Sequence, residues 1–214
     1  MGADRHQVND APEINEWFDA MRRDFKRWYL ASDNPWRQSG WGSTPERWRL
    51  AREVILSAVE HGGAFLDIGC ANGLLLECLI AWANERGVVI EPHGIDLVPE
   101  LVDLARQRLP EYASNFTTAN SFTWIPSRRY DYVHLLLESA PPSRHREYLG
   151  RVLDSAVARG GRLIVSNYGS RSKGESPIDV TGYLAGLGFT VAGSAAASEH
   201  DGFVITRTAW IERS

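Results

Sequence analysis

The stretch that most constrains the fold of this chain is Phe65-Leu66-Asp67-Ile68-Gly69-Cys70-Ala71-Asn72-Gly73, which is followed by the apolar run Leu74-Leu75-Leu76. An apolar segment that ends in an acid, then small residues, then a second apolar run predicts a strand, a tight loop and a helix start. Small residues in such a loop allow backbone N–H groups and the positive end of the helix to approach a ligand closely. The stretch therefore predicts a ligand-binding loop at the end of a buried strand.

Strands and helices alternate through the rest of the chain. The predicted strands span 64–69, 88–97, 115–119, 130–137 and 162–167, and the predicted helices span 72–86, a segment from Pro99, a segment from Ser143, and 177–187. Two final strands, 189–192 and 203–208, are joined by a loop short enough for an antiparallel hairpin. This alternation predicts an α/β fold of Rossmann type, a mostly parallel sheet with helices on both faces. Ligands of such sheets bind at the carboxyl ends of the strands.

The segment before this pattern predicts a helical arm over residues 1–43, and the α/β domain then covers 44–214. Apolar residues at positions 14, 17, 18, 21, 25 and 28 have helical spacing, and Thr44-Pro45 begins the next helix. Five of the eight tryptophans lie in residues 1–48. We expect this arm to act as a lid, with Gln38 to Trp41 either touching a ligand or serving only to pin the arm to the sheet.

Composition limits the possible partners. The 214 residues suit one domain, and the net charge of -4 argues against binding nucleic acid through bulk electrostatics. No apolar run approaches the roughly 20 residues that cross a bilayer, and the N-terminus lacks the apolar core of a signal peptide, so we expect a cytoplasmic protein without a membrane partner. Neither the two cysteines nor the six histidines have metal-ligand spacing, which predicts no metal site.

Polar residues follow the second and third predicted strands. Asp96 lies 29 residues after Asp67, and a carboxylate at this position can accept hydrogen bonds from both hydroxyls of a ribose. Leu97 can then lie against an adenine face. Asn120 and Ser121 follow the third strand, and the Asn120 amide can both donate to and accept from the edge of an adenine.

These residues together resemble the class I S-adenosylmethionine-dependent methyltransferases over roughly residues 44–209. The first motif of that family, acid-x-Gly-x-Gly-x-Gly, is matched by Asp67, Gly69, Ala71 and Gly73, and its ribose-binding acid by Asp96. The resemblance implies S-adenosylmethionine as cofactor and a seven-stranded sheet whose last strand is antiparallel. Ala71 replaces the middle glycine, which is tolerated if its φ stays negative. The cofactor-binding candidates are Asp67, Gly69, Cys70, Ala71, Asn72, Gly73, Asp96, Leu97, Asn120, Ser121, Gln38 and Ser39.

A nicotinamide-dependent enzyme is the alternative reading of a glycine loop after a strand. Such a loop has the pattern Gly-x-Gly-x-x-Gly, which this chain does not match.

The catalytic candidates are Glu138, Tyr168 and His145, each just after a strand or at the start of a helix. Glu138 is either a base or substrate anchor, or a solvated loop acid. Tyr168 either orients the acceptor or packs, and His145 is either at the rim of the site or an ordinary surface residue. Methyl transfer from a sulfonium mainly requires alignment of the nucleophile and exclusion of water.

The compact size and the aromatic arm favour methyl transfer to an oxygen or nitrogen atom of a small molecule. Two alternatives stay open: a methyltransferase on the same fold that acts on RNA or protein, and a non-catalytic protein that binds the cofactor. The oligomeric state is open as well.

Overall fold

The computed structural model describes residues 10–214, with side chains from residue 14 onward. Its centre is a seven-stranded sheet in the order β3-β2-β1-β4-β5-β7-β6. The strands from β3 to β5 are parallel, and β7 is antiparallel to both β5 and β6. This confirms the predicted fold. The strands are β1 (Gly63–Ile68), β2 (Ile90–Asp96), β3 (Phe116–Thr118), β4 (Tyr130–Leu136), β5 (Val157–Tyr168), β6 (Gly193–Ser198) and β7 (Val204–Glu212).

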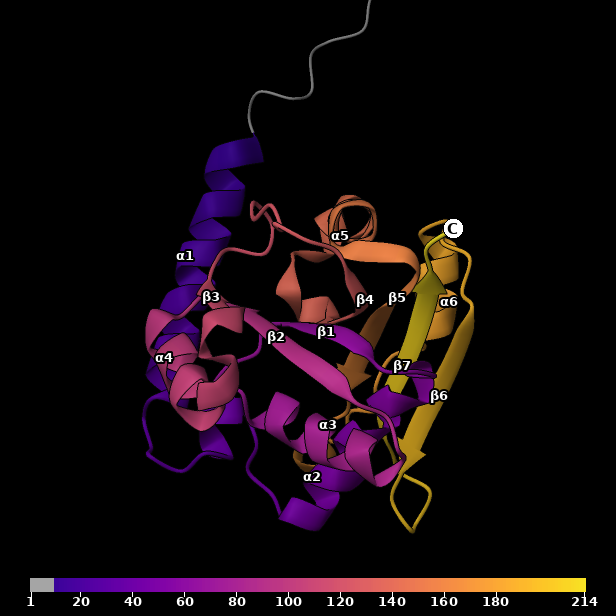
Figure 1. Cartoon of the computed structure of the whole chain (residues 1–214), viewed down its shortest axis with the longest axis horizontal. Coiled ribbons are helices and arrows are strands. Elements are labelled where there is room, and N and C mark those ends of the chain that lie inside the picture. Colours follow the sequence, from indigo (N-terminus) through magenta and orange to yellow (C-terminus); the bar gives the residue numbers. More distant parts are fainter. Residues whose placement is uncertain (1–9) are drawn as a thin grey trace, which may run out of the picture.

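Helices cover both faces of the sheet (Figure 1). One apolar cluster joins the strands to residues of α5 and α6, such as Leu149 and Leu184, and a second joins them to residues of α2, α3 and α4, such as Trp48, Leu76 and Val102. The two clusters are the core, and together they hold the carboxyl ends of β1, β2 and β4 at one edge. The helices are α1 (Asp10–Tyr29), α2 (Pro45–Arg52), α3 (Leu74–Glu85), α4 (Pro99–Arg108), α5 (His145–Ala156) and α6 (Val180–Gly186).

The last hairpin forms later in the chain than the sequence predicted. We expected its first strand at 189–192, whereas β6 spans Gly193–Ser198. Phe189 and Val191 instead pack against the core cluster beside α6. At the start of this edge strand a Cβ on Gly193 would lie 2.2 Å from the Trp210 ring, so the position requires glycine. Strand β5 also begins earlier than predicted, since Val157 already pairs with Tyr130 of β4.

Helix α1 lies along the side of the domain formed by α4 and β3 (Figure 1). Phe25 and Tyr29 near its end pack on a small cluster that contains Ala71 of the glycine loop and Leu101 of α4. Lys26 and Glu100 form an ion pair between α1 and α4. The described part of the predicted arm is thus packed on the sheet domain, next to the glycine loop, and residues 1–9 of the arm lie outside the described residues.

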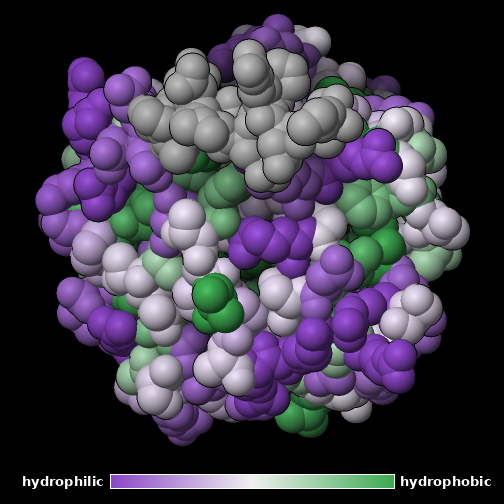
Figure 2. Space-filling view, turned by 90° about the horizontal axis from the view of Figure 1, so that it is seen from above, coloured by the Kyte–Doolittle hydropathy of each residue, from purple (hydrophilic) through white to green (hydrophobic). Residues whose placement is uncertain are grey.

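The surface is mixed in character. On the face drawn in Figure 2, hydrophobic residues occur in small separate groups among hydrophilic ones. Over residues 10–214, no helix combines the length and the apolar character that crossing a membrane requires.

Candidate functional site

The loop after β1 turns through left-handed backbone conformations. Gly69 has φ 86°, Ala71 has φ 47° and Gly73 has φ 75°. The condition under which alanine is readily tolerated in place of the middle glycine, a negative φ, is therefore not met at Ala71. A left-handed alanine costs roughly 1–2 kcal/mol, and here the same turn places the Ala71 N–H 2.9 Å from the Asp96 carboxylate. This hydrogen bond and contacts with Val98 and Leu101 accompany the strained conformation.

Asp96 ends β2 with its carboxylate almost completely buried. The Ala71 N–H donates to its Oδ2 at 2.9 Å, and the Val98 N–H donates to its Oδ1 at 2.9 Å. Burial raises the pKa of Asp96 to about 6, against the lowering effect of these backbone hydrogen bonds. Each oxygen keeps a lone pair for a further donor, so a buried acceptor group faces the cavity beside it.

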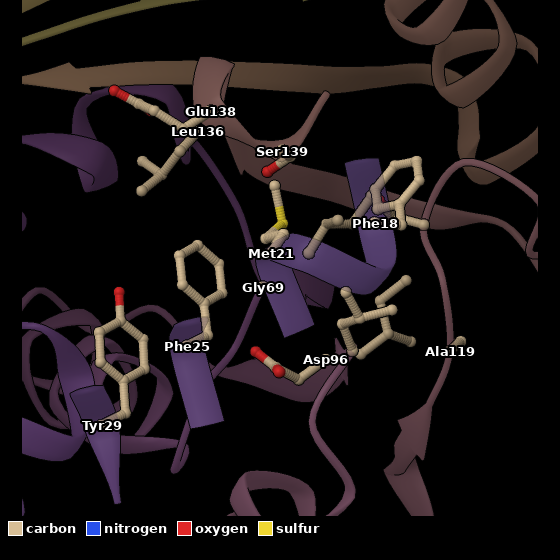
Figure 3. A pocket seen from close by; sticks show the side chains of 14 residues that line it. Phe18, Met21, Phe25, Tyr29, Gly69, Asp96, Ala119, Leu136, Glu138 and Ser139 are labelled. Carbon is tan, nitrogen blue, oxygen red and sulfur yellow. The ribbon is translucent and has the colours of Figure 1, made fainter. Parts of the chain in front are cut away.

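This first cavity, which we call the Asp96 cavity, lies between α1 and the carboxyl ends of β1, β2 and β4. Phe25 and Tyr29 lie on one wall, and the Asp96 carboxylate points into the space beside them (Figure 3). Helical spacing marked one apolar face of α1 in the sequence, but it did not indicate that residues of this face line a site. The lining residues are Phe18, Met21, Phe25, Tyr29, Ile68, Gly69, Ile95, Asp96, Leu97, Ala119, Ser121, Leu136, Glu138 and Ser139.

A second cavity, the Arg52 cavity, shares Tyr29, Ile68, Gly69 and Leu136 with the first, so the two adjoin. The Arg52 guanidinium is buried there, with its Cζ 3.4 Å from the centroid of the Tyr168 ring. Among the described residues, neither the Arg52 Nη1 nor the Tyr168 hydroxyl has a hydrogen-bond partner. Burial raises the pKa of Tyr168 to about 12, so the hydroxyl keeps its proton and can donate. Two unused donors at one end of a cavity are suited to an anion.

Arg52 was missed in the sequence analysis, but the sequence contains a signal for it. The residue lies four positions after Trp48 and three before Ile55, on the apolar face of the segment that starts at Thr44. A charged residue is rarely fully buried unless it is paired. An arginine on an apolar helix face is therefore a signal for a buried cation that binds a partner.

A row of buried polar groups lies beneath the Arg52 cavity. Asp67 Oδ1 is 2.8 Å from His134 Nδ1, and His134 Nε2 is 3.1 Å from the Ser166 hydroxyl. The Ser166 hydroxyl in turn donates to Thr208 Oγ1, which donates to the Val165 carbonyl. His134 is thus the hydrogen-bonded core histidine that a position inside a strand predicts, and Asp67 is held by the sheet while lining the cavity.

A third cavity, the Glu138 cavity, has a volume of about 420 Å³ and lies beyond the end of β4. It shares Glu138 with the Asp96 cavity, so the two meet at this residue. His145 lines it, with Nδ1 2.7 Å from the Tyr183 hydroxyl and Nε2 2.8 Å from the Ala140 carbonyl. The lining residues are Trp17, Leu137, Glu138, Ala140, Pro142, His145, Asn167, Ile178 and Tyr183.

The structure separates the predicted site residues into two groups. Those that line the Asp96 or Arg52 cavity are Asp67, Gly69, Cys70, Ala71, Asp96, Leu97, Ser121, Ser39, Glu138 and Tyr168. Those that line neither are Asn72, Gly73, Asn120, Gln38 and His145. The cofactor and catalytic roles assigned to all of them stay predictions.

Asn72, in the second group, joins the arm to the glycine loop. Its Nδ2 donates to the Pro35 carbonyl at 2.9 Å and to Gln38 Oε1 at 3.3 Å, and its Oδ1 accepts from the Ser39 hydroxyl at 2.5 Å. Asn120 Oδ1 accepts from the Phe122 N–H at 2.9 Å within its own turn.

Within residues 10–214 no group of three or more His, Cys, Asp or Glu side chains is placed to hold a metal ion.

The proteins to which the chain is similar in sequence and in structure carry the names of methyltransferases. No protein-family model matches the chain. The chain is 32% identical over 123 residues to "Trans-aconitate 2-methyltransferase" of Methylobacterium radiotolerans. This match covers 56% of this chain and 44% of that protein. The chain is also 27% identical over 191 residues to "Ribosomal protein L11 methyltransferase" of Burkholderia thailandensis. This match covers 89% of this chain and 56% of that protein. The chain therefore spans about half the length of the curated relatives it matches.

A solved structure shares the fold over nearly the whole chain. The N-methyltransferase NodS from Bradyrhizobium japonicum, in complex with S-adenosyl-L-homocysteine, superposes with a TM-score of 0.65 at 18% identity. The match covers 90% of this chain and 97% of NodS. At this identity the similarity shows a common architecture.

Proposed function

We propose that this chain is a class I S-adenosylmethionine-dependent methyltransferase. On that premise, it transfers a methyl group from S-adenosylmethionine to an oxygen or nitrogen atom of a small molecule. The observation that carries the proposal is the presence of two buried groups of opposite charge, one in each of two adjoining cavities. A carboxylate that can accept, Asp96, lines one cavity, and a cation with a free donor, Arg52, lines the other.

The side chains present fit the cofactor at both ends. The lone pairs left on Asp96 can accept from the two ribose hydroxyls, and Leu97 and the α1 aromatics supply apolar surface for the adenine. The unpaired Arg52 donor and the Tyr168 hydroxyl can bind the methionyl carboxylate. Gly69 lines both cavities, so its backbone lies where the two parts of such a ligand join.

When bound, S-adenosylmethionine supplies an already activated methyl group, so the chain mainly needs to align the acceptor and exclude water. Helix α1 serves the second purpose because Phe18, Met21, Phe25 and Tyr29 cover the Asp96 cavity. Glu138 lines both the Asp96 cavity and the Glu138 cavity, which supports a role in contacting an acceptor that enters from the side of α6.

Helix α1 must also move when the cofactor enters. The Asp96 and Arg52 cavities, which the cofactor would fill together, have volumes of about 100 and 80 Å³, whereas ligand pockets typically measure roughly 300–1,000 Å³. The wall that can yield is α1, because the other walls are formed by the ends of sheet strands and their loops. We infer that α1 opens to admit the nucleoside and closes over it.

The proposal is tested by incubating the protein with methyl-labelled S-adenosylmethionine and an extract of bacterial cells, then separating acid-soluble from acid-precipitated material. We expect label in the soluble, low-molecular-weight fraction, and none from the Asp96→Ala variant. Protein methylation is the second candidate, because one curated relative carries the name of a ribosomal protein methyltransferase. Label in precipitated protein or RNA would favour a macromolecular acceptor, and label in neither fraction would favour a non-catalytic binding protein.

A further inference from the structure

The Glu138 cavity has apolar walls and a small number of polar side chains. Trp17 of α1, Leu137 after β4 and Ile178 before α6 supply much of its apolar lining. Ile178 is a large hydrophobic residue that is 43% exposed, so it lies at the solvent-facing part of the cavity. Such a lining is suited to the hydrophobic body of a small molecule.

The Glu138 side chain is held in place by Asn167 of β5. Asn167 Nδ2 donates to Glu138 Oε1 at 2.9 Å, and Asn167 Oδ1 accepts from the backbone N–H of Ile178 at 3.0 Å. The Ile178 N–H can only donate, which fixes the orientation of the amide and directs its NH₂ group at the carboxylate. In Figure 3 the Glu138 side chain extends away from Asp96. The second carboxylate oxygen is left for a donor from a ligand.

The other polar side chains of this cavity are engaged with one another. The Ala140 carbonyl can only accept, so His145 Nε2 carries a hydrogen, and in the neutral ring Nδ1 accepts from the Tyr183 hydroxyl. Among the described residues that line the cavity, no lysine or arginine occurs and Glu138 is the one acid. A ligand carboxylate would therefore meet a like charge without a compensating cation.

We propose that the methyl acceptor is an amine with an apolar body, and that Glu138 binds its amino group where the Glu138 cavity meets the Asp96 cavity. This inference rests on the proposed function and narrows its acceptor from oxygen or nitrogen to nitrogen. Glu138 first accepts a proton from the bound ammonium and passes it to solvent, which frees the nitrogen lone pair. The lone pair then forms the new N–C bond, the electron pair of the S–C bond stays on sulfur, and the product leaves as the methylated ammonium. Trp17 and Ile178 bind the body of the amine.

The test uses ligands that differ only in the end group. Tryptamine, tryptophol and indole-3-propionate share an indole and a two-carbon chain, and phenethylamine, 2-phenylethanol and 3-phenylpropionate form a second series with a smaller ring. Each is titrated by calorimetry into the wild-type protein saturated with S-adenosylhomocysteine at neutral pH. We expect at least one amine to bind, and to bind at least about fivefold more tightly than its alcohol and more tightly still than its carboxylate.

Three variants test whether the charge of Glu138 at this position, rather than the net charge of the protein, binds the amine. Glu138→Gln is expected to weaken amine binding by at least about fivefold and to leave the alcohols nearly unchanged. Glu111→Gln removes the same charge from an exposed position outside the cavity, and amine binding should stay as in the wild type. Ile178→Lys adds a cation at the solvent-facing part of the cavity and should weaken amines while strengthening carboxylates.

The outcomes distinguish this inference from the proposed function. If S-adenosylhomocysteine itself does not bind to the folded wild-type protein, the proposed function fails and this inference fails with it. If it binds, but neither amine binds or the carboxylates bind as tightly as the amines, the amine assignment alone is overturned. Equal effects of Glu138→Gln and Glu111→Gln would also overturn it. N-methylated product from an amine, identified by mass spectrometry, is the expected supporting result.

Discussion

The backbone N–H of Ala71 donates a hydrogen bond to the carboxylate of Asp96 at 2.9 Å. The contact joins the glycine loop after β1 to the acid at the end of β2. It explains why Ala71 holds a left-handed conformation, and it fixes the carboxylate that the proposed function assigns to the ribose. Several expected results depend on this pair.

The first prediction concerns pH and stability. Burial raises the pKa of Asp96 from 3.8 to about 6, so the folded protein binds this proton more tightly than the unfolded chain. The contribution of Asp96 to the free energy of unfolding is therefore greatest below about pH 4 and is lost as the pH rises through about 6, a change of order 3 kcal/mol. Urea denaturation at several pH values checks this, because the difference in unfolding free energy between wild type and Asp96→Asn should fall over that window. A difference that does not depend on pH would contradict the assignment.

The second prediction concerns pH and ligand binding. Ribose hydroxyls donate to the ionised carboxylate, so ligand binding should lower the pKa of Asp96. The affinity for S-adenosylhomocysteine is expected to fall about tenfold per pH unit below about pH 6 and to level off above it. Calorimetry between pH 5 and pH 8 measures this, and Asp96→Asn should bind weakly with a flat profile. An affinity of the wild type that is constant over the range would exclude an ionised Asp96 from the contact.

The third prediction separates the two ends of the ligand. Arg52→Met removes a buried cation but retains an apolar side chain of similar length, so it should not lower the melting temperature of the free protein. It should weaken binding of S-adenosylhomocysteine by at least about tenfold and leave 5′-methylthioadenosine, which lacks the amino-acid carboxylate, unaffected. Asp96→Ala is the matched control, because both compounds carry the ribose and both should bind less tightly. Equal losses for both compounds in Arg52→Met would place Arg52 outside the carboxylate site.

The fourth prediction concerns α1. If α1 opens to admit the ligand and closes over it, amide hydrogen exchange in Asp10–Tyr29 should slow when S-adenosylhomocysteine is bound. Exchange in α6, Val180–Gly186, should change far less, because α6 does not line the Asp96 or Arg52 cavity. Exchange in α1 that is unaffected by a bound ligand would show that the helix is not the moving wall.

The fifth prediction tests the packing of the edge strand. A Cβ at Gly193 would lie 2.2 Å from the Trp210 ring, whereas no atom lies within 4 Å of a Cβ at Gly150 in α5. Gly193→Ala should lower the free energy of unfolding by about 1–3 kcal/mol. Gly150→Ala should raise it by up to about 1 kcal/mol, since alanine is the better helix former. Denaturant titration of the two variants measures both effects, and a neutral Gly193→Ala would mean that β6 is not held against Trp210.

Local patterns in the sequence were sufficient to predict the sheet. The run before Asp67 is apolar and buried on both faces, so it marks a parallel strand and the loop that follows it. The segment before Asp96 is less apolar, with Glu91 exposed and His93 buried. Strand β6 was placed too early because its alanines and serines have no strong strand preference, and it forms through pairing with β7 alone. Propensity does not report such tertiary pairing.

The candidate site could be predicted where a residue acts through the loop it belongs to, as Gly69 and Asp96 do. Tyr29 and Arg52 were missed because their roles depend on packing between elements far apart in the chain. The positive φ of Ala71 could not be predicted either, since it is set by a turn whose N–H donates to a carboxylate 25 residues away. In each case the deciding contact joins segments whose distance in space the sequence alone does not indicate.

Calorimetric titration of S-adenosylhomocysteine into wild-type protein and the Asp96→Ala and Glu111→Gln variants tests the central claim most directly. We expect one binding site in the wild type, an unchanged affinity in Glu111→Gln, and an affinity at least about tenfold lower in Asp96→Ala. No heat of binding with well-folded wild-type protein, or equal affinities for wild type and Asp96→Ala, would contradict the account.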